Sequence, residues 1–121
     1  MASTAQEIIV FAGLYDHLIT LQTNQNGSTV DVSIAVKQQG GGHGQSANTN
    51  WTMYLERAIN DAWIPIGTRT GYTSNTSPSN RDFPNIPKED NPLRIRMVYK
   101  GFNPNTNKPQ DYHQNSKVWI R

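Results

Sequence analysis

Cysteine is absent from this chain of 121 residues. The absence excludes a disulfide framework and any metal site built on thiolates. Long apolar runs are missing too: Ile8-Ile9-Val10-Phe11-Ala12 is too short for the core of a signal peptide, and a membrane-spanning helix needs about 20 apolar residues. We therefore expect one soluble domain over residues 1–121, without a membrane span. Any export to the cell surface or exterior would use a route without a cleaved signal.

Charged side chains are few and almost balanced, since 11 Lys and Arg stand against 9 Asp and Glu. A net charge of +2 argues against a nucleic-acid partner, because binding phosphates takes several uncompensated cations. Uncharged polar residues are abundant instead: 13 Asn, 8 Gln, 8 Ser and 11 Thr make up about a third of the chain. Such side chains form hydrogen bonds at any pH, which favours contact with sugars or with other proteins.

Helical periodicity is nearly absent, whereas apolar and polar residues alternate along several segments. Alternation predicts strands with one face in the core and one in water. Three such core faces are predicted: Val30, Val32, Ile34 and Val36; Leu93, Ile95, Met97 and Tyr99; and Val118 and Ile120. Trp119 lies between the last two, so we expect it to point outward, whereas we expect Trp51 and Trp63 in the core.

Less regular strands are predicted at 7–14, which we expect to be buried on both faces, and at 17–23, 51–58 and 63–70. Asn26-Gly27 and Asn60-Asp61 are expected at hairpin turns, since these residues tolerate positive φ. Pro65 removes a backbone donor and predicts a strand that lies at an edge or is broken at this residue. The fold class is therefore all-β: an antiparallel two-sheet β-sandwich, jelly-roll or galactose-binding-like, with about seven to eight strands.

Three long connections separate the predicted strands, at 38–50, 71–91 and 101–116. Loops of this length in a small domain are usually functional or disordered. The first contains the run Gly40-Gly41-Gly42-His43-Gly44, which lacks the Gly-Lys-Ser/Thr ending of a phosphate-binding loop.

Catalytic motifs are absent from the sequence. There is no Gly-x-Ser-x-Gly, the three histidines are scattered, and no spacing pairs the acidic residues. We expect no enzyme and no cofactor. A calcium site is a weaker alternative, because Glu89-Asp90-Asn91 and the 103–111 loop supply oxygen ligands, although not at EF-hand spacing.

The function that these observations favour is non-catalytic, lectin-like carbohydrate binding through loops at one end of the sandwich. Amides and carboxylates would orient sugar hydroxyls, an aromatic face would cover the ring, and homo-oligomerisation would raise the affinity. The candidate binding residues are His43, Gln45, Asn48, Tyr72, Asn105, Asp111, Tyr112 and, as a stacking platform, Trp119.

Two further interpretations stay open. A self-assembling structural subunit of a capsid, fibre, pilus or appendage also fits neutral polar surface and long proline-rich loops. In addition, Arg94, Arg96 and Lys100 share one strand face, and this basic stripe favours an anionic glycan or an acidic face of a neighbouring subunit over nucleic acid. We expect Asp31, Glu56 and Glu89 to pair with it.

The end of the chain resembles that of small galactose-binding bacterial lectins, in Val98-Tyr99, the Asn-rich loop, Tyr112 and Asn115-Ser116. The resemblance covers about a quarter of the chain. Lys100-Gly101 stands where that family has an acidic calcium ligand, so no residue role is carried over from it.

Overall fold

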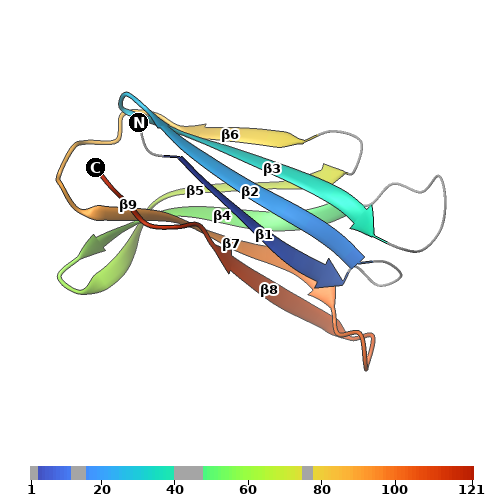
Figure 1. The fold of residues 1–121 in the computed structure, drawn as a ribbon. Coiled ribbons are helices and arrows are strands. Elements are labelled where there is room, and N and C mark those ends of the chain that lie inside the picture. Colours follow the sequence, from blue (N-terminus) through green and yellow to red (C-terminus); the bar gives the residue numbers. More distant parts are fainter. Residues whose placement is uncertain (1–2, 12–15, 40–47, 75–77) are drawn as a thin grey trace.

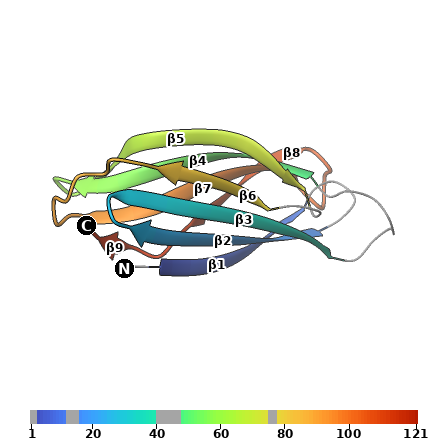
Figure 2. The same ribbon diagram turned by 90° about the horizontal axis from the view of Figure 1, so that it is seen from above.

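The computed structural model describes residues 3–11, 16–39, 48–74 and 78–121. These ranges form two antiparallel sheets that pack face to face (Figures 1 and 2). One sheet has four strands in the order β1-β2-β3-β6, and the other has five, in the order β5-β4-β7-β8 with β9 also paired to β7. The strands are β1 (Ser3–Phe11), β2 (Asp16–Asn26), β3 (Thr29–Gln39), β4 (Asn48–Ile59), β5 (Ala62–Ser74), β6 (Ser79–Phe83), β7 (Pro92–Phe102), β8 (Pro109–Asn115) and β9 (Trp119–Ile120).

The predicted β-sandwich is confirmed, but the described residues form nine strands rather than seven or eight. The difference lies in two connections that were expected to be long loops. β6 and β8 carry little alternation, because Phe83 and Tyr112 are almost their only large apolar residues. Each pairs with a strand in which apolar and polar residues alternate clearly, β6 with β3 and β8 with β7. Among the described residues, no helix has the length and apolar character needed to cross a membrane.

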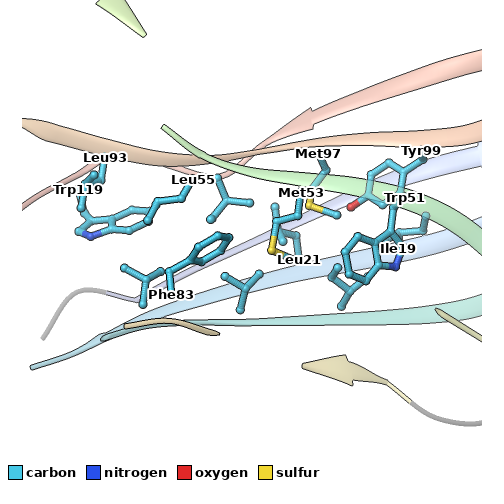
Figure 3. Packing of buried hydrophobic residues seen from close by; sticks show 14 of the residues in the cluster. Ile19, Leu21, Trp51, Met53, Leu55, Phe83, Leu93, Met97, Tyr99 and Trp119 are labelled. Carbon is cyan, nitrogen blue, oxygen red and sulfur yellow. The ribbon is translucent and has the colours of Figure 1, made fainter. Parts of the chain in front are cut away.

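The core lies between the two sheets (Figure 3). β3 buries Val30, Val32, Ile34 and Val36, and β7 buries Leu93, Ile95, Met97 and Tyr99, as predicted. β2 and β4 add Ile19, Leu21, Trp51, Met53 and Leu55. Each such side chain stabilises the fold by about 1.5–3 kcal/mol when it leaves water completely.

Both predicted hairpins are present. Asn60 and Asp61 form the two-residue β4–β5 loop with φ of 52° and 64°, the two positive values of a type I′ turn. The β2–β3 loop is shifted by one residue from the expected Asn-Gly pair. Asn26 pairs with Thr29, so the loop is Gly27-Ser28, and Gly27 takes the positive φ of 60°.

Pro65 lies on β5, an edge strand, as predicted. Its register partner is Glu56, whereas the preceding residue Leu55 pairs with Gly67, so Ile66 is an extra residue in a β-bulge. The missing backbone donor of proline is tolerated at such a position.

The strand predicted at 7–14 is not buried on both faces. β1 is the outer strand of its sheet, and within it only Val10 is fully buried. Ile9 points to the outer face and is 44% exposed. An apolar run gives the composition of a strand but not its place in the sheet, and an edge position leaves one face uncovered.

Two arginines close the side of the sandwich where the edges of β5 and β6 meet. Arg69 donates to the Asp82 carbonyl at 3.0 Å and lies over the Phe83 ring at 4.5 Å. Arg81 lies over Trp51 at 5.2 Å and donates to the Thr70 carbonyl. These side chains join the edges of the two sheets without strand pairing between them.

A buried histidine links the sheets through a hydrogen bond between His17 Nδ1 on β2 and Thr49 Oγ1 on β4, at 2.8 Å. Desolvation by burial lowers the pKa of His17, and the charge of Asp16 opposes part of that shift.

Candidate binding site

Three of the predicted binding residues cannot be placed. His43 and Gln45 lie outside the described residues, and of Asn48 only the backbone at the start of β4 is described. The loop-end site therefore rests on the other members of the set.

Asn105, Asp111 and Tyr112 come together at the hairpin between β7 and β8. Asn105 is exposed in the turn, and its backbone N–H donates to Asn103 Oδ1 at 2.8 Å. Asp111 accepts from Lys100 Nζ at 2.9 Å, so its charge is already compensated. The Tyr112 hydroxyl donates to the Phe102 carbonyl at 2.8 Å, which holds the hairpin together.

A small hollow of about 230 Å³ lies at this end of the sheet and is lined in part by Asn50, Lys100 and Asp111. Tyr72 is 65% exposed and is the register partner of Asn50. Since β4 and β7 separate Tyr72 from Asp111, three strand spacings put them about 14 Å apart. Only an extended ligand could contact both.

Trp119 does not point outward, so this prediction was wrong. Trp119 pairs with Leu93 on β7 and shares its inward face, where it is 6% exposed, whereas Val118 and Ile120 are 52% and 60% exposed. Its Nε1 donates to Gln25 Oε1 at 3.0 Å. Alternation establishes that neighbouring residues face opposite sides, but only the register decides which side is the core.

A larger hollow lies on the outer face of the four-stranded sheet, and the sequence did not predict it. It measures about 720 Å³, and we call it the trough. Cross-strand pairing produces two rows of outward residues along its floor. The rows are Ser3, Asn24, Asp31 and Asp82, and Ala5, Gln22, Ser33 and Asn80.

Among the residues that line the trough, Thr4 and Thr23 hydrogen-bond to each other, whereas the side chains of the two rows are free of partners in the described ranges. No side chain in these two rows makes a hydrogen bond or an ion pair with any residue in the described parts of the chain. Asp31 and Asp82 are direct cross-strand neighbours, an arrangement of like charges that costs stability. The trough thus offers amides, hydroxyls and two carboxylates, is also lined by Arg81, and contains no aromatic side chain.

The basic stripe lies on the outer face of the five-stranded sheet and is partly neutralised. Arg94 Nε and Arg96 Nε contact Glu56 Oε1 and Oε2 at 2.9 and 3.1 Å. The predicted pairing of Glu56 is therefore present. Glu89 contacts Arg57 instead, and Asp31 is on the other sheet.

The two tryptophans expected in the core differ. Trp51 is buried there, but Trp63 is half-buried on the outer face, where Arg94 lies over its ring at 4.2 Å.

No metal-binding cluster is found in the described ranges, where no three His, Asp or Glu side chains lie close enough together to hold an ion. Comparison with known proteins adds nothing to the site: no family model, curated protein or solved structure matches this chain.

Proposed function

We propose that this protein is a non-catalytic carbohydrate-binding protein and that the trough is its principal site. The observation that carries the proposal is the trough itself, a hollow of about 720 Å³ along whose floor two rows of outward side chains have no hydrogen bond or ion pair in the described structure. Ligand sites of small molecules fall in the range of about 300–1,000 Å³. A volume of this size accommodates a short oligosaccharide.

The chemistry of the lining favours sugar hydroxyls. An amide both donates and accepts, and a carboxylate accepts two hydrogen bonds from neighbouring hydroxyls. Asn24 and Asp31 are half-buried on adjacent central strands, so their positions are held by the sheet. Because neighbouring strands are about 4.8 Å apart, the two rows present polar groups at a regular spacing across the sheet.

The trough would replace the loop end as the principal site. Asp111, Tyr72 and Asn105 lie on or beside the five-stranded sheet, so they would contribute to a separate, secondary subsite. Binding at one shallow site would be weak, and oligomerisation would raise the apparent affinity through avidity.

The proposal is tested by screening the protein against neutral oligosaccharides and measuring the best ligand by calorimetry. Asp31→Asn removes a charge-assisted acceptor with little change in shape, so we expect a loss of affinity of about tenfold or more. Lys37→Gln is the matched control, since Lys37 is on the outer face of the same strand but does not line the trough. Wild-type protein that binds no neutral sugar, or equal affinities for the two variants, would refute the proposal.

A second candidate function is the self-assembling structural subunit. The observation in its favour is β1, an edge strand of nine residues with neither proline nor lysine and with Ile9 exposed. Such an edge lacks the usual protection against pairing with another chain. Light scattering over a hundredfold range of concentration tests this candidate. Species that grow with concentration, and that Ile9→Lys abolishes, would favour it, and a constant mass would exclude it.

A further inference from the structure

The outer face of the five-stranded sheet holds two arginines in fixed positions. Arg94 on β7 lies over the Trp63 ring, and Arg96 lies over the Tyr54 ring, each at 4.2 Å from the centroid. The Nε atoms of both arginines bind the two oxygens of one carboxylate, that of Glu56. We call these five residues the arginine patch.

These contacts fix the guanidinium groups in place through their Nε atoms and ring faces, and they leave the η nitrogens available. Glu56 is only 3% exposed, so it sits beneath the arginines, whose side chains are 20% and 29% exposed. The η nitrogens of Arg94 and Arg96 donate to no residue in the described ranges. Groups held in place by stacking and an ion pair lose little conformational entropy when a ligand binds.

The patch also carries surplus positive charge. Two arginines share the single negative charge of Glu56, which leaves one cation uncompensated. Further along the same strand face Lys100 is already paired with Asp111. The second guanidinium leaves N–H donors and a charge available to an anion.

The geometry points to an anion-binding site for the sulfate or carboxylate groups of an acidic polysaccharide. Arginine donors match the oxygen pairs of these groups, and Arg94 and Arg96, two residues apart on one strand, are spaced about 6.6 Å along it. Tyr54 has Thr68 on β5 as its other cross-strand neighbour, so an exposed hydroxyl lies two strands away from Arg96 for contacts with sugar. The choice of a polysaccharide rests on the proposed function, whereas the anion site itself does not.

The test uses the full chain and three polymers: dextran sulfate, uncharged dextran and polyglutamate. Arg96→Gln and the double variant Arg94→Gln/Arg96→Gln remove the donors. Arg96→Lys retains the positive charge but lacks the planar guanidinium group with its paired N–H donors. It replaces the glutamine variants in the test if those do not fold. Arg69→Gln removes an arginine that also stacks on an aromatic ring, on another part of the molecule. Lys37→Gln changes the net charge by the same amount as Arg96→Gln.

We expect dextran sulfate to bind more tightly than dextran and polyglutamate, and to bind more weakly as salt is added. Arg96→Gln should reduce its affinity about tenfold to a hundredfold, the loss of one charge-assisted hydrogen-bonding group, and Arg96→Lys by a smaller factor. Arg69→Gln and Lys37→Gln should bind within about twofold of the wild type, since surface charges remote from a site contribute little.

Other outcomes would overturn the inference. Equal binding of polyglutamate would assign the patch to polyanions in general. No binding of dextran sulfate, or equal losses in the two controls, would leave it a structural network. Arginine variants that lower the oligomeric mass would make it a contact between copies of the chain. The Asp31→Asn variant separates the two proposals, because it should weaken neutral-sugar binding and leave dextran sulfate binding intact.

Discussion

Replacing Arg57 with methionine should be among the most destabilising single changes in this protein. Arg57 is on β4, points inward and is 1% exposed. Its Nη1 donates to the main-chain oxygen of Arg121 at 2.8 Å, and its Nη2 donates to the Pro87 carbonyl at 2.7 Å. Its Nε contacts Glu89 at 2.9 Å. One side chain thus fastens the segment before β7 and the end of the chain to the five-stranded sheet.

The magnitude follows from these contacts. Each hydrogen bond from a charged donor contributes about 1.5–3 kcal/mol, and the ion pair about 0–1 kcal/mol because the Glu89 side chain is 47% exposed. Methionine fills most of the volume and recovers part of the loss by apolar contact. We expect Arg57→Met to lower the free energy of unfolding by about 3–5 kcal/mol, a large share of the roughly 5–15 kcal/mol of a typical domain.

Urea unfolding followed by tryptophan fluorescence measures this loss, and calorimetry should show a fall in Tm of about 10–20 °C. Glu89→Gln is the control, because it removes the same ion pair but leaves both carbonyls bound to Arg57. It should cost less than Arg57→Met, because Arg57 keeps both main-chain partners. Equal losses in the two variants, or a loss below about 1 kcal/mol for Arg57→Met, would refute the reasoning.

Three further predictions concern the core. The Tyr99 hydroxyl donates to the buried Gln114 Oε1 at 2.5 Å, so Tyr99→Phe leaves that oxygen without a partner and should lower the free energy of unfolding by about 1–3 kcal/mol. In a double-mutant cycle, adding Gln114→Leu should recover part of that loss. Burial lowers the pKa of His17 in the folded protein, so the unfolded chain takes up a proton at a higher pH than the folded one. The free energy of unfolding should therefore fall as pH drops below about 6.5, and His17→Asn should abolish that slope in urea titrations. Gly101→Ala would place a Cβ 2.6 Å from the Phe11 carbonyl oxygen and should cost about 1–3 kcal/mol, whereas an unchanged Tm would show that the strands can move apart.

Much of the fold follows from local patterns. Alternation placed the core faces of β3 and β7, because successive side chains of a strand point to opposite sides. Asn60-Asp61 and Pro65 marked a turn and an edge strand through backbone restrictions that act within a few residues. The same alternation placed Arg94 and Arg96 on an outer face.

Other features depended on which strands meet, and no local pattern contains that information. Trp119 turned inward because β9 pairs with β7 in one register and not the next. Glu56 reached both arginines because β4 lies beside β7, although about 40 residues separate them in sequence.

The trough is the clearest case. Its residues come from β1, β2, β3 and β6, and two of them, Asn80 and Asp82, lie in a segment that the sequence predicted to be a loop. The sequence by itself determined, through alternation, only that Asp31 and Ser33 lie on the solvent face of a strand. Only the strand order and register, set by packing between residues far apart in the chain, brought Asn24, Asp31 and Asp82 into one row over a common hollow.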